Sequence, residues 1–291
     1  MTRSTTVGTL VLFVVALCAA AQPATSERAL TKADYQKVVE SPETDALFKE
    51  FLAKLPTVTL GTQNRRTYYV LEGDLLLTEE QVRAAIRNYS TAPRPALSTG
   101  ELKIMMAGGK PVYWPTGQRR LTYAIDRTTF RTQSEYDAVV RNMKNAGQAW
   151  SDVCPKCGLK FVHVKDADAK PSPEAVTFIV TFDPQETGFI AASFFPNDPQ
   201  DRRVLIITPS YFTTRFDRTG VLRHEIGHIN GYRHEHIEGI PGCFREDADW
   251  KPLTAYDSHS VMHYFCGGGG TLDLRHTDID KVGHRKVYAQ K

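Results

Sequence analysis

The chain has 291 residues, of which 41% are hydrophobic and 24% charged. This length allows one large domain or two smaller ones, and the composition excludes collagen, extended disorder and a coiled coil as descriptions of the whole chain. The 36 Lys and Arg residues and 33 Asp and Glu residues leave a formal net charge of +3. Because no long basic run accompanies this small charge, we expect no nucleic-acid partner.

The first 21 residues have the pattern of a secretory signal peptide. Arg3 precedes an apolar run from Val7 to Leu17, and the small residues Ala19 and Ala21 suit cleavage after Ala21. The run is shorter than the roughly 20 residues that a membrane-spanning helix needs, and no later segment is apolar over such a length. We therefore expect a secreted protein without stable membrane insertion, from which residues 1–21 are removed.

Removal of the signal peptide would also remove Cys18 and leave four of the five cysteines. An even number of cysteines in an oxidising compartment predicts two disulfides. Four cysteines allow three pairings, and sequence alone does not decide among them. The four are Cys154, Cys157, Cys243 and Cys266.

Residues 22–110 are segmented and polar, with short helical patterns. Thr78 and Gln81 have the spacing of a capping box, which predicts the start of a helix. The Pro- and Gly-rich segments 92–96 and 106–111 are typical of exposed connectors. We therefore expect a domain boundary near residue 110.

Residues 111–291 have the pattern of a compact α+β domain. Apolar residues at intervals of three and four predict an amphipathic helix over 134–150, and further helices are expected over 217–232 and 278–288. Apolar runs bounded by Pro, Asp and Gly predict strands. These strands are 121–125, 161–164, 176–182 and 204–207.

Three histidines cluster on the second of these helices and just after it. Residues four apart on a helix lie about 40° apart around its axis, so His224 and His228 point from one face toward a common point. Gly231 can end the helix in a left-handed conformation, which lets His234 approach from the side. Three nitrogen ligands with a fourth position left for water match a catalytic zinc. Glu225, next to the first ligand, fits the general base of peptide hydrolysis.

These residues resemble the signature H-E-x-x-H-x-x-G-x-x-H of the metzincin metallopeptidases, and Ser260 to Tyr264 resembles the methionine turn that follows it. Glu235, directly after the third histidine, and Tyr264, two residues after Met262, are similar to the astacin-like group of the clan. The resemblance implies that Met262 forms a hydrophobic floor under the metal. It also implies that Tyr264 is a fifth ligand that swings away to stabilise the oxyanion.

The resemblance further implies a fold and its boundaries. Residues 111–291 would form a zincin, metzincin-like catalytic domain with a twisted, mostly parallel mixed sheet, an active-site helix and a long backing helix. An irregular C-terminal subdomain ending in a helix would follow the sheet. Residues 22–110 would be a small propeptide.

The activity implied is that of a zinc metalloendopeptidase acting on protein or peptide substrates. One zinc ion would bind to His224, His228 and His234, and Glu225 would be the general base. We expect this secreted enzyme to be a monomer.

Three alternatives stay open. A matrixin-like metalloprotease would share the ligands and the base, although Glu235 and Tyr264 argue against it. A non-enzymatic secreted zinc-binding protein on a peptidase scaffold would be expected to have lost Glu225 or a ligand. A closed structural zinc site would have four protein ligands and no open position for water.

A latency device is predicted before the catalytic domain. No cysteine lies between Ala21 and Cys154, so a cysteine switch is excluded. Astacin-like propeptides use an aspartate in a segment F-x-G-D, and Leu71-Glu72-Gly73-Asp74 is similar to it. Because a carboxylate can occupy the position of water on zinc, we predict that Asp74 caps the metal. The alternative is that Glu-Gly-Asp forms only a tight turn between two strands.

For the disulfides, we expect Cys243 to pair with Cys266, because both lie in the Gly- and Pro-rich region around the methionine turn. Cys154 and Cys157 would then close a short loop after the helix over 134–150. In isolation, this pair also fits the knuckle of a zinc ribbon, but that reading needs a second similar pair. The cysteine placement departs from that of typical astacins.

Overall fold

A computed structural model describes residues 32–60, 65–71, 74–91, 102–185, 188–237, 240, 243 and 249–290. The predicted signal peptide, residues 1–21, and the predicted connector 92–96 lie outside these residues. The described chain consists of helices and a mixed sheet with smaller sheets beside it, which confirms the α+β class.

The main sheet has five strands and is mostly parallel. In spatial order they are β7 (Lys160–His163), β6 (Arg120–Ile125), β8 (Phe178–Phe182), β10 (Val204–Ile207) and β9 (Ala191–Ala192). The first four are parallel to their neighbours, whereas β9 runs antiparallel at one edge. Leu205 and Ile207 of β10 pack into the main core, while Ile206 packs into a second core on the other face. Both faces are covered, which explains why this strand is apolar throughout.

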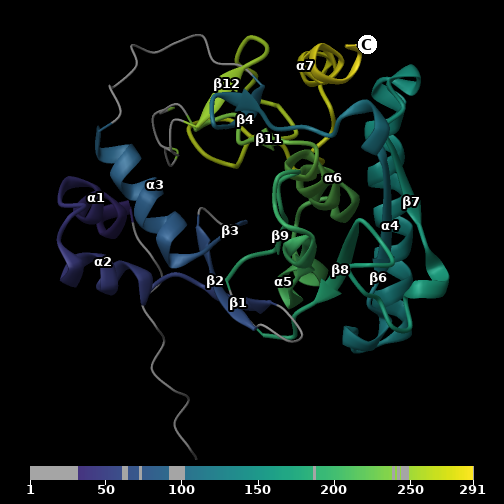
Figure 1. Cartoon of the computed structure of the whole chain (residues 1–291), viewed down its shortest axis with the longest axis horizontal. Coiled ribbons are helices and arrows are strands. Elements are labelled where there is room, and N and C mark those ends of the chain that lie inside the picture. The colour runs from purple at the N-terminus through teal and green to yellow at the C-terminus, as the bar shows by residue number, and fades with distance from the viewer. Residues whose placement is uncertain are drawn as a thin grey trace, which may run out of the picture.

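Helix α4 (Gln133–Val153) fixes helix α6 (Arg218–Ile229) beside the sheet (Figure 1). Gly147 lets α4 approach β7 closely, because a Cβ atom there would lie 2.7 Å from Phe161 Cβ. The fully buried Trp150 donates its Nε1 proton to the carbonyl of Arg223 in α6 at 2.8 Å. The remaining helices of this part are α5 (Pro209–Thr213), α7 (Asp278–Tyr288) and the short 3₁₀ turns Thr116–Gln118, Arg127–Thr129, Pro155–Cys157, Lys165–Ala167 and Gln200–Arg202.

A small antiparallel sheet lies beyond the end of α6. Its strands are β11 (Tyr232–Arg233), β4 (Lys103–Ala107), β12 (Trp250–Pro252) and β5 (Lys110–Pro111), and β4 pairs with the other three. The exposed connector predicted over 106–111 is therefore partly wrong: its residues form a hairpin. Gly108 and Gly109, with φ of 55° and 74°, supply the turn between its strands. The predicted boundary near residue 110 falls inside this hairpin.

The N-terminal elements form a body with its own core, which lies apart from α4 in Figure 1. They are α1 (Lys32–Glu40), α2 (Asp45–Leu52), β1 (Thr57–Leu60), β2 (Arg66–Leu71), β3 (Leu75–Leu77) and α3 (Glu79–Thr91). The capping box before α3 is confirmed, because Thr78 and Gln81 exchange side-chain and backbone hydrogen bonds at 2.9 and 3.2 Å. Val58, Val70 and their neighbours pack with Phe189 and Ile206, joining this body to the main sheet.

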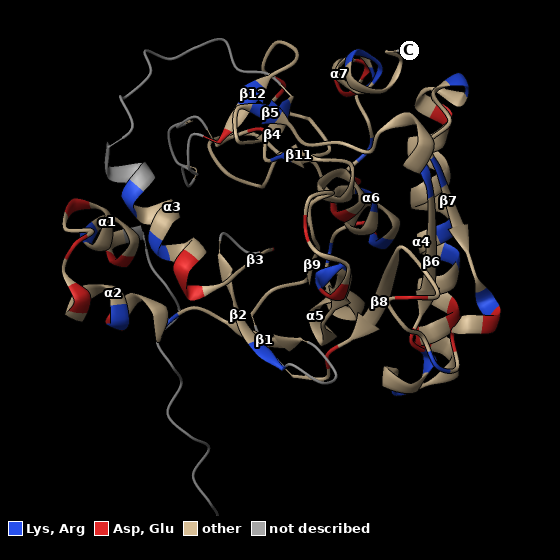
Figure 2. Ribbon diagram, in the orientation of Figure 1, with Lys and Arg blue, Asp and Glu red and all other residues tan. Residues whose placement is uncertain are grey.

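The two disulfides of the structure are Cys154–Cys157 and Cys243–Cys266, the pairing that we expected. Helices α1, α2 and α3 carry both acidic and basic residues, as Figure 2 shows. Arg83 and Arg87 of α3 pair with Asp45 and Glu43, respectively. Within the described residues, no helix has the length and apolar character needed to cross a membrane.

Candidate metal centre

Helix α6 presents His224 and His228 on one buried face. The helix starts at a cap, where the Asp217 carboxylate accepts the Gly220 N–H at 2.6 Å. It ends at Ile229, earlier than the range 217–232 that we expected. The reason is Gly231, whose φ of 97° confirms the predicted left-handed turn.

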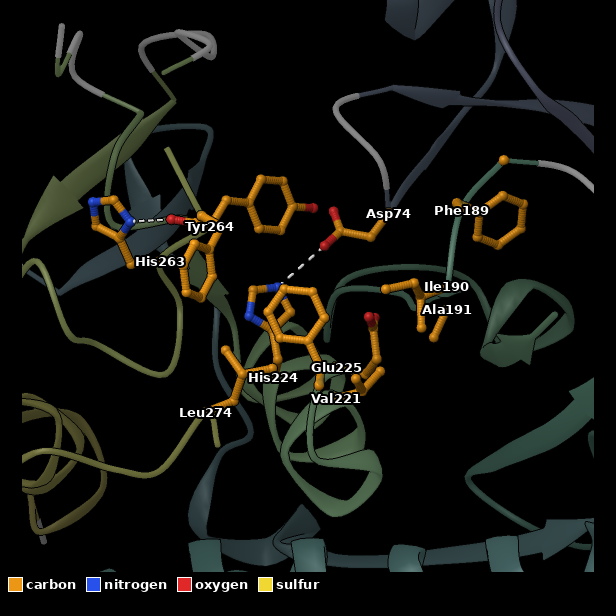
Figure 3. A pocket seen from close by; sticks show the side chains of 13 residues that line it. Asp74, Phe189, Ile190, Ala191, Val221, His224, Glu225, His263, Tyr264 and Leu274 are labelled. Atoms are coloured by element: carbon orange, nitrogen blue, oxygen red, sulfur yellow. Dashed lines mark hydrogen bonds and ion pairs between the residues drawn. The ribbon is translucent and has the colours of Figure 1, made fainter. Parts of the chain in front are cut away.

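Three histidines and one aspartate converge in the interior. Asp74 Oδ2 lies 3.1 Å from His224 Nε2, 3.0 Å from His234 Nε2 and 3.5 Å from His228 Nε2. All four side chains are buried, and their potential ligand atoms lie within 4.8 Å of one another. Asp74 comes from the start of β3 in the N-terminal body, as Figure 3 shows for its contact with His224. The structure thus brings together residues that are 150 positions apart.

Hydrogen bonds orient two of the rings. His224 Nδ1 lies 2.7 Å from the carbonyl of Val261, and His228 Nδ1 lies 2.8 Å from the carbonyl of Tyr232. A carbonyl only accepts, so Nδ1 carries the proton and the Nε2 of the neutral ring carries a lone pair. Burial lowers the pKa of His228 to about 4, which keeps this ring neutral at pH 7. Both rings therefore direct lone pairs at the common centre.

This arrangement fits a zinc ion. The centre collects acceptor atoms, which repel one another unless a proton or cation lies among them. His224 Nε2 and His234 Nε2 are 3.3 Å apart. Tetrahedral zinc with bonds of about 2.0–2.1 Å separates its ligand atoms by about 3.3 Å. Three imidazoles and one carboxylate are also a donor set that zinc accepts.

Asp74 is an ionised carboxylate in this setting. Burial opposes its ionisation, but the surrounding imidazoles of His234, His228 and His224 hold its pKa well below the usual range. Its second oxygen, Oδ1, has no hydrogen-bond partner among the described residues. The tight turn that we considered as the alternative role is compatible with this position, since Leu71 and Leu75 pair in register across it. Glu72 and Gly73 lie outside the described residues.

Glu225 follows the first histidine and is buried. Its Oε2 atom has no hydrogen-bond partner in the part of the chain that the structure describes. Burial, reinforced by the negative charge of Asp74, raises the pKa of Glu225 well above its usual value. In Figure 3 the carboxylates of Glu225 and Asp74 and the hydroxyl of Tyr264 face one space. The Glu225 carboxylate is thus a buried titratable group beside the three histidines.

Met262 packs under α6, and α7 holds it there. It is fully buried, and a Cβ atom on Gly227 would lie 2.2 Å from its sulfur. The Asp280 carboxylate accepts the Ser260 hydroxyl at 2.6 Å and the Val261 N–H at 3.0 Å. The last helix thus anchors the turn that carries Met262.

Tyr264 lies against the ligand rings. Its ring centroid is 4.2 Å from that of His234 and 5.6 Å from that of His224. The side chain is partly exposed, and Figure 3 shows its hydroxyl directed toward Asp74. A phenol at this place has a hydrogen to donate to any oxygen that develops charge near the centre.

A cavity of about 270 Å³ opens beside the site. Asp74, His224 and Glu225 line one side of it. The rest of the lining is mostly apolar and includes Ile190, Ala191, Phe216, Val221, Phe265 and Leu274. Figure 3 labels Ile190, Ala191, Val221 and Leu274 around the space. Phe265 and Phe216 meet edge to face with ring centroids 5.7 Å apart, so aromatic side chains form the outer wall.

A second group of potential ligands lies nearby, formed by His236, His263 and Cys266. Cys266 is bonded to Cys243 and offers no thiolate. His263 Nε2 is engaged by the Tyr256 hydroxyl at 2.7 Å. This group therefore lacks the donors of a metal site.

Sequence reasoning missed two residues that support the centre. Lys103 is fully buried and donates to the carbonyl of Glu235 at 2.7 Å. Trp114 donates its Nε1 proton to the carbonyl of Ile229 at 2.7 Å, which satisfies the end of α6. The sequence did indicate burial of Trp114, because an isolated Trp just before the first predicted strand of this part favours a buried position. Lys103 had no such indication, because a lysine in a polar stretch is usually exposed.

We predict that Gly231→Ala weakens both the fold and zinc binding. A Cβ atom there would lie 2.1 Å from the Val112 carbonyl, and φ of 97° is costly for alanine, by about 1–3 kcal/mol. The backbone leading to His234 would then approach the metal centre at a different angle. Zinc affinity, from competition with a chelator, and the free energy of unfolding in denaturant measure both effects. Gly117→Ala is the control, because nothing lies within 4 Å of its Cβ position. Equal behaviour of the two variants would contradict this role of Gly231.

Comparisons with known proteins add little to this geometry. No family model matches the sequence, and no curated protein matches it. Among solved structures, 78 chains are similar. One, described as "Structure of myroilysin", is 18% identical, and the match covers 65% of this chain and 99% of that one with a TM-score of 0.46. Because this TM-score is below 0.5, the likeness carries no inference, and the function rests on the residues described above.

Proposed function

We propose that this protein is a secreted, zinc-dependent endopeptidase of the astacin-like type, made as a latent precursor. The observation that carries the proposal is the meeting of three imidazole Nε2 atoms beside a buried carboxylate, Glu225, whose Oε2 lacks a hydrogen-bond partner among the described residues. A purely structural metal site has no use for such a carboxylate. Two disulfides agree with the oxidising compartment that the signal-peptide pattern predicts.

His224, His228 and His234 would hold the zinc ion. When bound, zinc polarises the carbonyl of the scissile peptide bond and lowers the pKa of a water molecule toward about 7. The protein's part is to orient the rings so that each presents its Nε2 atom to the ion. The carbonyls of Val261 and Tyr232 do so for two of them.

Glu225 and Tyr264 would carry the proton and charge transfers. The Glu225 carboxylate takes a proton from the attacking water and later delivers it to the leaving amine. Its burial favours this role, because a raised pKa makes the carboxylate a stronger base near neutral pH. The Tyr264 hydroxyl donates a hydrogen bond to the oxygen of the tetrahedral intermediate as negative charge develops on it.

Asp74 would keep the precursor inactive. Its carboxylate lies among the three ligand rings, where the substrate carbonyl and the water must enter. The N-terminal body holds it there through the core shared with the main sheet and through Arg202, which donates to the Leu76 carbonyl at 2.9 Å. Activation would therefore need cleavage of the chain and departure of this body.

The cavity supports a preference in the substrate. Its mostly apolar walls adjoin Glu225, so they would take the side chain of a residue next to the scissile bond. A volume of about 270 Å³ has room for a large aliphatic or aromatic side chain. We infer that peptides with such a residue are cleaved in preference to those with a charged one.

A closed structural zinc site is the second candidate, because Asp74 supplies a fourth protein donor. The unpartnered Glu225 carboxylate and the open cavity beside it favour the enzyme. The Tyr264 ring, which packs against His234, disfavours a matrixin-like enzyme. The presence of Glu225 disfavours a non-enzymatic zinc-binding protein.

We predict that Glu225→Gln abolishes most peptidase activity and leaves zinc bound. General acid–base catalysis contributes roughly 10²- to 10⁴-fold, so kcat/KM of the processed form should fall by about that factor. Zinc content, measured on the same sample, should stay at one ion per chain. Chelator should remove the activity of the wild type, and added zinc should restore it. Activity that survives both changes would refute the mechanism.

We predict that Asp74→Ala makes the unprocessed precursor active. Without this carboxylate the position of water on zinc would be open, and coupling free energies between such states are typically about 1–3 kcal/mol, so precursor activity should rise by roughly 5- to 150-fold. Asp45→Ala is the control, since Asp45 is an exposed residue of the same body that pairs with Arg83. An Asp74→Ala precursor no more active than the wild-type precursor would exclude the switch.

We predict that Phe265→Lys shifts cleavage toward acidic residues. Phe265 is 50% exposed on the cavity wall, so the lysine has space and faces the bound side chain. An exposed ion pair of up to about 1 kcal/mol corresponds to a shift of up to about fivefold in relative kcat/KM. Peptides with Leu or Glu at the same place measure this ratio. Leu272→Lys, 45% exposed and outside the cavity lining, should leave the ratio unchanged; an equal shift in both variants would count against the assigned cavity.

A further inference from the structure

The stretch Leu102 to Ala107 precedes the boundary expected near residue 110, yet it packs around the third histidine. In β4, Lys103 pairs with Arg233, and Ile104 pairs with Tyr232. The Met105 N–H also donates to the carbonyl of Gly231 at 2.8 Å. β4 thus binds residues 231–233, which lead directly into the third histidine.

Lys103 supports the other side of the same histidine. Its side chain is fully buried, and its ammonium group donates to the Glu235 carbonyl, the residue directly after His234. The Glu235 N–H in turn donates to the Met262 carbonyl at 2.9 Å. A buried ammonium is costly unless it is paired, so a lysine in this place stabilises one position of the backbone. His234 is therefore fixed by β4 before it and by Lys103 after it.

The same strand is joined to the C-terminal part of the chain. β12 pairs with β4 on its other edge. Leu102 donates its N–H to the Thr254 hydroxyl at 2.8 Å and accepts the Leu253 N–H at 2.9 Å. Its side chain meets α7 so closely that a Cβ atom on Gly283 would lie 2.5 Å from Leu102 Cδ2. Removal of β4 would open the main core as well as the metal centre.

The N-terminal body makes contacts of a different kind. One of its apolar clusters is formed only by residues of this body. A second cluster is shared with the main sheet. Asp74 is the contribution of this body to the metal centre. Among the described residues, its core clusters contain no residue from the segment around His234, whereas β4 pairs with that segment.

Resting on the proposed function, we propose that β4 belongs to the working enzyme and that Lys103 is a positioning residue for the third zinc ligand. The cut that frees the centre from Asp74 therefore falls after Asp74 and before Leu102, and the mature chain retains residues 102–110.

The first test measures zinc affinity in the full chain. Outer contacts of metal ligands are worth about 10- to 100-fold in affinity, so Lys103→Met should raise the Kd for zinc by roughly that factor. Lys110→Met, on the exposed neighbouring strand β5, should bind zinc like the wild type. The absorption spectrum of the cobalt-substituted protein should change in the first variant alone, which reports on ligand geometry. Unchanged affinity and spectrum in Lys103→Met would overturn the positioning role.

The second test does not depend on a variant that folds. The full wild-type chain is digested by limited proteolysis, and the N-terminus of each active species is determined by sequencing and intact mass. Every active species should begin at or before Leu102. An active species that begins after Ala107 and retains no fragment containing β4 would overturn the proposal.

These results also separate the proposal from the function on which it rests. If no species hydrolyses peptides but Lys103→Met still weakens zinc binding, the peptidase assignment fails and the positioning role stands. If the protein hydrolyses peptides and Lys103→Met binds zinc as tightly as the wild type, only the positioning role fails.

Discussion

Hydrogen-bond acceptors facing one another in a buried space are the constraint on which this structure depends. The Nε2 atoms of His224 and His228 carry lone pairs because the Nδ1–H groups of these rings donate hydrogen bonds to backbone carbonyls. The Asp74 carboxylate lies 3.0–3.5 Å from all three rings. A proton or a cation among them removes this repulsion. The elements around this centre keep these atoms together against that repulsion.

That support comes from several elements of the larger part of the chain. α4 holds α6 through Trp150, and α7 holds the Met262 turn through Asp280. Trp114 closes the end of α6, and β4 holds the strand that leads to His234. These contacts are buried hydrogen bonds and close packing, which resist displacement better than exposed ion pairs do. A site supported this way is preorganised before any ligand binds.

Two buried carboxylates face this centre, and their environments differ. Asp74 is surrounded by the three rings, which favour its ionised form, whereas burial and the charge of Asp74 raise the pKa of Glu225. Departure of Asp74 would remove one of the two causes that raise the Glu225 pKa. Under the proposed function, the precursor and the processed form would thus differ in the proton affinity of Glu225 as well as in access to the centre.

The sequence by itself determined the local parts of this protein: the helix with His224 and His228 on one face, the left-handed turn at Gly231 and the α+β class. These follow from spacing of a few residues, because helical period and glycine conformation are local properties. Only the tertiary structure decided that Asp74 meets the histidines, that Cys243 pairs with Cys266 and that Lys103 is buried under Glu235. Those contacts join segments far apart in the chain. The segment around Asp74 and the placement of the cysteines favoured the first two contacts but left alternatives open, and no local pattern indicated the third. For Lys103 the composition even points the other way, because a lysine is buried only where a distant partner offsets its desolvation.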